Sequence, residues 1–277
     1  MSERAGKDTK YSILIDTTRC VGCELCVDAC KASNGLPADQ PRRWKRAIDD
    51  LSSTRYSTFV RQADHRFIRK QCRHCLEPAC ASACIVGALR RTAEGAVIYD
   101  DSKCMGCRYC MVACPFDIPR YDWDKAVPYV RKCTMCYERM QAGEIDQPAC
   151  VGACPHRAMA FGSRLGLLEE ARRRMDAAPG RYYENRIFGE SEIGGTAIMY
   201  VSDIDLGFLA WKPELGDTPL PERTWAALSK VPPIVLGMGG LMAATYWIIE
   251  RRIKLQAAAA GGDSAAGAIP PASEESE

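Results

Sequence analysis

Cysteine constrains this chain more than any other residue, because four short segments carry all 16 of its cysteines. Each segment holds four of them, and we call the segments blocks one to four. In chain order the blocks are Cys20, Cys23, Cys26 and Cys30; Cys72, Cys75, Cys80 and Cys84; Cys104, Cys107, Cys110 and Cys114; and Cys133, Cys136, Cys150 and Cys154. A motif that occurs four times indicates a repeated local structure, so the cysteines are expected to act in sets.

The spacing within the blocks predicts iron–sulfur clusters. Blocks one and three both read C-x2-C-x2-C-x3-C. In this motif three thiolates on a tight loop bind one [4Fe–4S] cluster, and the fourth cysteine binds the other cluster of a pair. Block two (C-x2-C-x4-C-x3-C) and block four (C-x2-C-x13-C-x3-C) keep this arrangement with an insertion before the third cysteine. The sequence therefore predicts four [4Fe–4S] clusters with no thiol left over.

Two other uses of cysteine fit this spacing less well. Zinc sites usually gather two pairs of cysteines from separated segments, and three cysteines within seven residues would crowd one zinc ion. Disulfide scaffolds are mostly short secreted chains, whereas 277 residues can bury a hydrophobic core without cross-links. We therefore interpret all 16 cysteines as iron ligands.

The spacing alone does not determine which blocks exchange their fourth cysteines. Adjacent blocks two and three are plausible partners, which leaves blocks one and four for each other. Under this pairing the ligand sets are Cys20, Cys23 and Cys26 with Cys154; Cys133, Cys136 and Cys150 with Cys30; Cys72, Cys75 and Cys80 with Cys114; and Cys104, Cys107 and Cys110 with Cys84.

The segments between the blocks predict an α+β fold. Runs of β-branched and aromatic residues are typical of short strands. They occupy residues 11–16, 56–62, 65–70, 95–100, 158–162 and 194–205. Residues 165–176 have helical periodicity. We expect residues 1–205 to form a four-cluster domain of two ferredoxin-like lobes, each with two clusters.

One apolar run near the C-terminus predicts a single transmembrane helix. Residues 231–249 contain no charged side chain. At about 1.5 Å per residue such a helix spans about 28 Å, close to the thickness of the bilayer interior. Pro213, Pro219 and Pro221 indicate an irregular linker at 206–230. We expect an anchor at 231–250 and a disordered tail at 255–277; a buried core helix is the alternative for the anchor.

The charges around this run favour one orientation. Arg251, Arg252 and Lys254 follow it, whereas Arg223 and Lys230 precede it. Positive residues collect on the cytoplasmic side, so we expect the cluster domain on the outer, periplasmic face. No apolar run precedes Cys20, so export is expected to depend on a partner that carries a signal.

The remaining polar residues indicate no catalytic site. The formal net charge of +2 gives no reason to expect a nucleic-acid partner. Basic clusters at 42–46, 61–70 and 89–91 are interpreted as solvated surface; the alternative is a docking face or a field that raises nearby redox potentials. We interpret His74, which lies between two predicted ligands, as a structural or surface histidine rather than a hydrogen-bond partner of a cluster. Core packing is the preferred interpretation for Tyr109, Tyr121, Trp123 and Tyr129, and shielding of the clusters from water is the alternative.

The four-block arrangement resembles the iron–sulfur electron-transfer subunits of respiratory molybdenum and nickel–iron enzymes. These are the beta subunits of formate dehydrogenases, membrane-bound hydrogenase subunits, and the corresponding subunits of dimethyl sulfoxide and polysulfide reductases. The resemblance covers about residues 11–205 through KQCRHCLEPAC, CMGCRYCMVACPFDIPRYD, KCTMC and ACVGACPHRAMAFG. Within this family, the resemblance is greatest to the subunits of formate dehydrogenases and hydrogenases, because these share the segment GGTAIMYVSD followed by an anchor. The hydrogenase-2 type is favoured by the segment CRYCMVACPFDIPRYD. One departure is Ile85 after Cys84, where the family often has proline.

The resemblance implies the crossed ligand sets given above and electron transfer as the function. It also implies two partners: a large catalytic subunit with nickel–iron or molybdenum/tungsten chemistry, and a multi-span membrane subunit that exchanges electrons with quinone. The alternatives are a soluble carrier with several clusters, a subunit of a dimethyl sulfoxide or polysulfide reductase type of complex, and a self-contained oxidoreductase.

Overall fold

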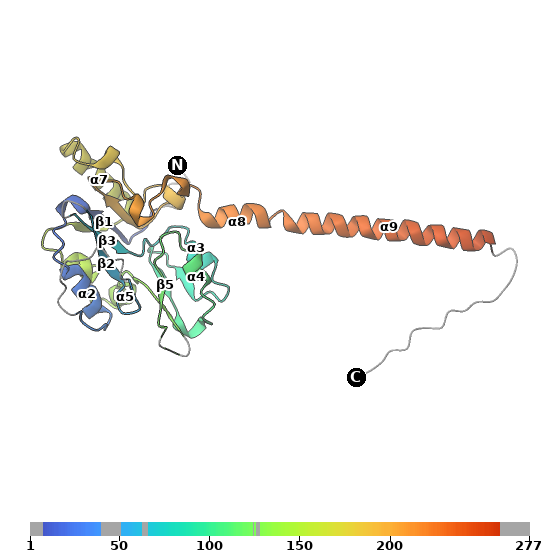
Figure 1. Cartoon of the computed structure of the whole chain (residues 1–277), viewed down its shortest axis with the longest axis horizontal. Coiled ribbons are helices and arrows are strands. Elements are labelled where there is room, and N and C mark those ends of the chain that lie inside the picture. The colour runs from blue at the N-terminus through green and yellow to red at the C-terminus, as the bar shows by residue number, and fades with distance from the viewer. Residues whose placement is uncertain (1–7, 40–50, 63–65, 124, 126–127, 261–277) are drawn as a thin grey trace. The chain divides into compact units, whose positions relative to one another are not determined.

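The structure is a computed structural model that describes residues 8–39, 51–62, 66–123, 125 and 128–260 (Figure 1). It divides into two units, Met1–Arg223 and Thr224–Glu277. All 16 cysteines lie in the first unit. Its architecture is mixed α and β, as expected from the sequence.

A central sheet joins three segments that are far apart in the sequence. Strand β1 (Ser12–Asp16) pairs antiparallel with β8 (Met159–Gly162) and parallel with β9 (Ile198–Val201), giving the order β8-β1-β9. All three strands lie within predicted ranges. β1 leads into block one and β8 follows block four, so their pairing brings these two blocks together.

Three hairpins connect the cysteine blocks. β2 (Ser57–Arg61) pairs with β3 (Phe67–Gln71) directly before block two. β4 (Leu89–Arg91) pairs with β5 (Val97–Tyr99) between blocks two and three, and β6 (Arg120–Tyr121) pairs with β7 (Val130–Arg131) between blocks three and four. β2, β3 and β5 were predicted, whereas the two- and three-residue strands β4, β6 and β7 were not.

Short helices carry the third cysteine of each block. They are α2 (Leu25–Ser33), α3 (Ala79–Ser82), α4 (Tyr109–Val112) and α6 (Ala149–Gly152). α5 (Tyr137–Gln141) follows the second cysteine of block four. Turns of 3-10 helix occur at η1 (Thr17–Arg19), η3 (Asp101–Lys103), η4 (Tyr183–Asn185), η5 (Glu192–Gly194), η6 (Gly207–Leu209) and η7 (Pro213–Leu215).

Helix α7 (Arg164–Ala177) covers the central sheet, close to the predicted range 165–176. Ser163 caps it, since its Oγ accepts a hydrogen bond from the Gly166 amide at 3.3 Å. Leu167, Leu168 and Met175 are buried against residues of β1 and β9. Full burial of one such side chain contributes about 1.5–3 kcal/mol, so this face fixes α7 on the sheet.

The first unit extends beyond the predicted boundary at residue 205. Trp211 is fully buried and its ring centroid lies 4.8 Å from that of Phe116. Residues 206–230 are also not irregular throughout, because α8 (Leu220–Leu228) is a regular helix. The prolines in this segment suggested a linker, but Trp211 has enough apolar surface to hold the chain on the core.

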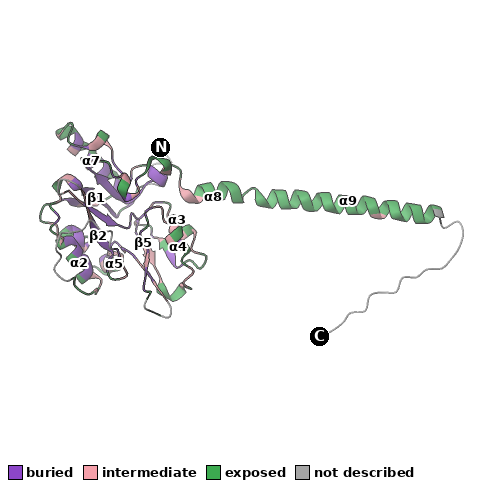
Figure 2. Ribbon diagram, viewed as in Figure 1, coloured by how far each residue is buried: buried purple, intermediate pink, exposed green. Residues whose placement is uncertain are grey.

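Helix α9 (Val231–Ala260) dominates the second unit, and its side chains from Val231 to Ile249 are exposed (Figure 2). Within the described ranges it forms the one candidate membrane span, which is consistent with a single-pass anchor. The tail was expected to begin at residue 255, but 255–260 continue the helix, since alanine has the highest helix propensity. Residues 261–277 lie outside the described residues.

Candidate cluster-binding sites

Three cavities in the first unit are each lined by four cysteines. Site A is lined by Cys20, Cys23, Cys26 and Cys154. Site C is lined by Cys72, Cys75, Cys80 and Cys114. Site D is lined by Cys84, Cys104, Cys107 and Cys110. In each cavity three cysteines come from one block and the fourth comes from another, and these groups coincide with three of the predicted ligand sets.

The remaining cysteines are Cys30, Cys133, Cys136 and Cys150, which we call site B. Burial raises the pKa of the Cys30 thiol to about 11, and the nearby sulfurs of Cys150 and Cys136 add to this effect. Burial likewise raises the pKa of Cys133, with a further contribution from Cys30 and Cys150. These four cysteines therefore lie close enough to influence one another, although they belong to blocks one and four.

Backbone turns direct the thiols of one loop toward a common space. Glu24, Arg108 and Cys136 each directly precede a helix and have φ of 59°, 65° and 52°. Such left-handed conformations are uncommon for residues other than glycine. Glu24 and Arg108 directly follow the second cysteine of blocks one and three, whereas Cys136 is itself the second cysteine of block four. In blocks one and three the strained residue therefore lies at the bend between the second and third cysteines.

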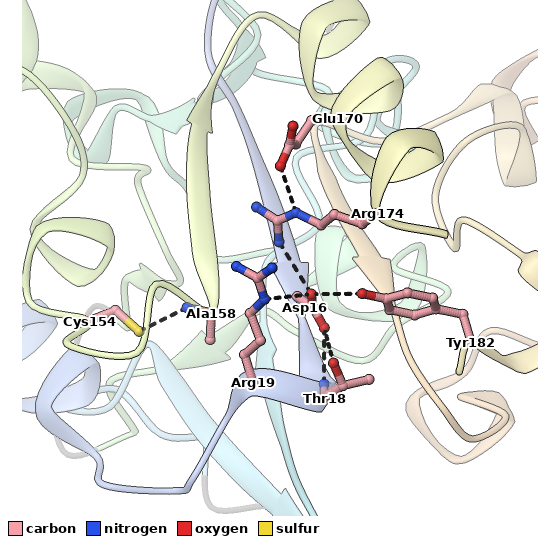
Figure 3. Close-up of polar contacts among 8 residues, drawn as sticks. All are labelled: Asp16, Thr18, Arg19, Cys154, Ala158, Glu170, Arg174 and Tyr182. Atoms are coloured by element: carbon pink, nitrogen blue, oxygen red, sulfur yellow. Dashed lines mark hydrogen bonds and ion pairs between the residues drawn. The ribbon is translucent and has the colours of Figure 1, made fainter. Parts of the chain in front are cut away.

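A buried carboxylate fixes the start of the block-one loop (Figure 3). Asp16 accepts hydrogen bonds from the amide of Thr18 at 3.1 Å and from its hydroxyl at 2.7 Å. Its other oxygen contacts the guanidinium groups of Arg19 and Arg174, both at 3.3 Å, and accepts from the Tyr182 hydroxyl at 3.2 Å. η1 is therefore held between β1 and α7, and Cys20 follows it directly.

The same region positions the fourth cysteine of site A. The Asp16 amide donates to the Ala158 carbonyl at 2.7 Å, which continues the pairing of β1 with β8. The Ala158 amide in turn donates to the Cys154 sulfur at 3.4 Å (Figure 3). The pairing of β1 with β8 thus positions Cys154 relative to the block-one loop.

Several polar groups contact cysteine sulfurs at the other sites. The Met135 amide donates to the Cys133 sulfur at 3.4 Å. The hydroxyl groups of Tyr121 and Ser33 lie 3.7 Å and 3.5 Å from the sulfurs of Cys110 and Cys136. Hydrogen bonds to the sulfurs are one means by which proteins set the reduction potential of a cluster.

The donor set fits iron–sulfur clusters. All 16 cysteines are free thiols, and burial raises the pKa of Cys26 and Cys114 to about 11 in each case. Buried thiolates require positive charge nearby, which cluster iron supplies when bound. In the part of the chain that the structure describes, no three such side chains are arranged to hold a single metal ion. The thiols instead surround spaces, as a cubane with one thiolate per iron requires.

Comparison with known proteins identifies the family. Residues 63–164 match the 4Fe-4S dicluster domain. The chain is 43% identical to a protein of Nitratidesulfovibrio vulgaris over 91% of this chain and 70% of that protein. It is 32% identical to the hydrogenase-2 operon protein HybA of Escherichia coli O157:H7 over 69% of this chain and 70% of HybA. It is 34% identical to the formate dehydrogenase iron–sulfur subunit of Haemophilus influenzae over 85% of this chain and 79% of that subunit.

The chain belongs to the family of [4Fe–4S] electron-transfer subunits. This confirms the predicted family and its description as an iron–sulfur electron-transfer subunit of an oxidoreductase. It also supports [4Fe–4S] clusters as the cofactor of these cysteines.

His74 lies in the protein interior. It is fully buried, and its Nδ1 accepts a hydrogen bond from the Val97 amide at 2.8 Å. Burial lowers the pKa of His74 well below 6.5, and Lys132 lowers it further, so the imidazole is neutral at physiological pH. His74 is therefore not a surface residue, and its hydrogen bond to Val97 ties block two to β5, while its Nε2 has no hydrogen-bond partner among the described residues.

Two interpretations from the sequence were wrong. Tyr109 and Trp123 are 57% and 59% exposed, so they are not core residues, whereas Tyr121 is buried beside Cys110. Arg69 and Lys70, taken as solvated surface, are only 2% and 8% exposed. They lie on β3, and Arg69 lines the cavity of site A. Residues 42–46 of the first basic cluster lie outside the described residues.

Proposed function

We propose that this chain carries four [4Fe–4S] clusters, one at each of sites A to D, and relays electrons between a catalytic subunit and a quinone-linked membrane subunit. The observation that carries the proposal is the composition of sites A, C and D, where three cysteines of one block meet one cysteine of another. The protein binds the clusters, excludes water from them and sets their potentials. Each cluster, when bound, accepts and releases one electron.

Electrostatic interactions between cysteines of different sites support a linear order. Cys26 of site A interacts electrostatically with Cys150 of site B. Cys133 of site B interacts with Cys72 of site C, and Cys80 of site C interacts with Cys110 of site D. These three pairs support the order A–B–C–D, in which an electron entering at one end leaves at the other.

We further propose that sites A and B belong to one ferredoxin-like lobe and sites C and D to another. Exchange of fourth cysteines links A with B through blocks one and four, and C with D through blocks two and three. Leu89, Val97, Tyr121 and Val130 form a hydrophobic cluster around site D that is separate from the main core. A separate core at site D supports a second lobe.

The relatives suggest the class of catalytic partner. One is named for the hydrogenase-2 operon and another is a formate dehydrogenase subunit. The partner proposed here is therefore a nickel–iron hydrogenase or a molybdenum or tungsten enzyme. α9 anchors the chain beside the membrane subunit, where Gly239 with Ala243 and Gly240 with Ala244 offer small residues for helix packing. The flanking charges support a cluster domain on the outer face.

Single cysteine variants test the crossed ligation. Cys30→Ser is expected to perturb the same cluster as Cys133→Ser, although Cys30 lies in block one. Cys154→Ser is expected to perturb the same cluster as Cys20→Ser. Electron paramagnetic resonance (EPR) of the reduced variants identifies the affected cluster in each case. If Cys30→Ser instead altered the signal that Cys20→Ser alters, each block would hold its own cluster and the crossed sets would be wrong.

A further inference from the structure

Arg69 is a buried cation without an acidic partner. It lies on β3 and is 2% exposed. No described carboxylate forms an ion pair with it. Its two terminal nitrogens donate to Ser57 Oγ at 3.0 Å and to Met159 Sδ at 3.3 Å, while its Nε has no hydrogen-bond partner among the described residues. An isolated buried charge is strongly unfavourable, so anions must compensate it.

The available anions are the cysteine ligands of two sites. Arg69 lines the cavity of site A. Ser57, which accepts a hydrogen bond from Arg69, also interacts with Cys30 of site B. Met159, the other hydrogen-bond partner of Arg69, lines the cavity of site A. The guanidinium therefore lies between sites A and B.

We propose that Arg69 is a shared counterion that raises the reduction potentials of the clusters at sites A and B. This inference depends on the proposed four-cluster function and adds a residue that sets the potentials. Reduction adds one negative charge to a cluster, and a fixed cation stabilises that charge. The effect is large because the site is buried and poorly screened by salt. Arginine suits this role since it stays protonated in proteins.

Site C has its own cations, so we expect Arg69 to have little effect on the potential of a cluster there. Arg73 lines site C, and its guanidinium lies over the rings of Tyr200, Trp211 and Phe116 at 4.5, 5.3 and 5.6 Å. Lys132 also lines this cavity. The residues that line site D include no cation. Loss of Arg69 should therefore act on sites A and B and leave site D unchanged.

Potentiometric titration followed by EPR of the full chain in its native complex tests this role. In Arg69→Gln, two clusters are expected to shift to lower potential. At a fixed ambient potential their ratio of reduced to oxidised form falls at least tenfold, which corresponds to about 59 mV for a one-electron couple. Arg69→Lys keeps the positive charge, so the midpoint potentials of these two clusters are expected to stay close to those of the unmodified protein. Iron content, measured on the same samples, is expected to remain unchanged.

Arg164→Gln is the matched control. Arg164 is also buried, but it donates to the carbonyls of Thr196, Gly189 and Glu190 and lines none of the three cysteine cavities. Arg164→Gln should leave the midpoint potential of every cluster unchanged. If Arg69→Gln loaded its clusters and shifted no midpoint more than Arg164→Gln, the proposal would be overturned. An equal shift in Arg69→Lys and Arg69→Gln would also overturn it.

A second variant keeps the test decisive if Arg69→Gln does not fold. Arg69→Met also removes the charge, with little change in side-chain volume and without a new buried amide. It should lower the midpoint potentials of the clusters at sites A and B, and unchanged midpoints in loaded protein would contradict the proposal. Failure of the proposed function has a different signature: low iron content, or Cys30→Ser and Cys133→Ser acting on different clusters. Failure of this inference leaves fully loaded clusters at unchanged potentials.

Discussion

Asp16 and Asp100 occupy the same position, four residues before the first cysteine of blocks one and three, and both hold the turn that leads into the block. Each carboxylate accepts from the amide two residues later, Thr18 or Ser102, at 3.1 Å. Each also pairs with the cation that precedes the cysteine, Arg19 or Lys103. The side chain of Asp16 is fully buried, whereas that of Asp100 is 35% exposed. Blocks one and three therefore begin with the same turn, which is buried at Asp16 and partly exposed at Asp100.

Asp16→Ala should destabilise the protein far more than Asp100→Ala. Removing Asp16 leaves Arg174 and Tyr182 without their shared acceptor, and breaking a buried charge pair costs about 3–5 kcal/mol. Asp100→Ala loses the same local hydrogen bonds where water can replace them. Denaturant unfolding and iron content of both variants check this. Equal losses would show that the turn, and not the buried network, provides the stability.

Gly22→Ala should reduce stability and cluster binding at site A more than Gly106→Ala reduces them at site D. Both glycines lie between the first and second cysteines and have φ of 70° and 75°. A left-handed conformation costs alanine about 1–2 kcal/mol at either position. A Cβ on Gly22 would also lie 2.4 Å from Cγ of Phe67, whereas the nearest atom to a Cβ on Gly106 is 3.8 Å away. Overpacking adds about 1–3 kcal/mol at Gly22.

Iron content per chain and thermal stability distinguish the two variants. Gly22→Ala is expected to lose stability and iron, while Gly106→Ala loses less of both. A Gly22→Ala protein as stable as Gly106→Ala would mean that the Phe67 ring moves aside without cost.

Local features of this protein were predictable from sequence because they depend on near neighbours. The three clustered cysteines of a block, the longer strands and helix α7 all follow from short-range spacing, whereas the two- and three-residue strands β4, β6 and β7 do not. The fourth cysteine of each predicted set was harder, since Cys154 meets the block-one loop only because β1 pairs with β8. The spacing left this pairing open, and family resemblance supplied it.

Two of the failures, at Arg69 and at Trp211, share one cause, which is burial by distant segments. Basic runs are usually solvated, so the sequence favoured a surface for residues 61–70 over an effect on redox potentials, whereas Arg69 is buried and lines site A with cysteines of blocks one and four. Prolines around Trp211 suggested a linker, yet Trp211 packs on Phe116 and Tyr200 from remote segments. Contacts of this kind appear only once the chain has folded.

Acid should selectively weaken the attachment of α7 through Glu170. Hydrogen bonding to Arg174 lowers the pKa of Glu170 below 4.5, although partial burial opposes this. A carboxyl with a depressed folded-state pKa adds stability above its unfolded pKa and loses it as the pH falls through the folded pKa. Glu170→Gln should therefore be about 0.5 kcal/mol less stable at neutral pH, with a difference that vanishes well below pH 4.5.

Glu169→Gln is the control for this effect, because Glu169 is the exposed neighbour on the same helix. Urea unfolding of both variants and the unmodified protein, under anaerobic conditions from neutral to acidic pH, provides the comparison. A Glu170→Gln deficit that persisted at the lowest pH would exclude the charge as its origin.

Removal of residues 231–277 should separate the cluster domain from its anchor. The first unit ends at Arg223 and contains every cysteine, so the truncated chain is expected to keep its iron. α9 from Val231 to Ile249 has no ionisable residue except Tyr246, which offers no proton relay or metal ligand. In the assembled complex, reduction of a soluble dye should persist while quinone-linked activity falls. Full quinone-linked activity without α9 would mean that the first unit docks unaided.

Iron and acid-labile sulfide per chain, measured after anaerobic purification, test the central claim most directly. Four clusters at sites A to D require about sixteen irons and sixteen sulfides per chain, with negligible zinc. EPR of the fully reduced protein should then account for about four spins. Half that iron content in fully folded protein, or stoichiometric zinc in its place, would contradict the four-cluster account.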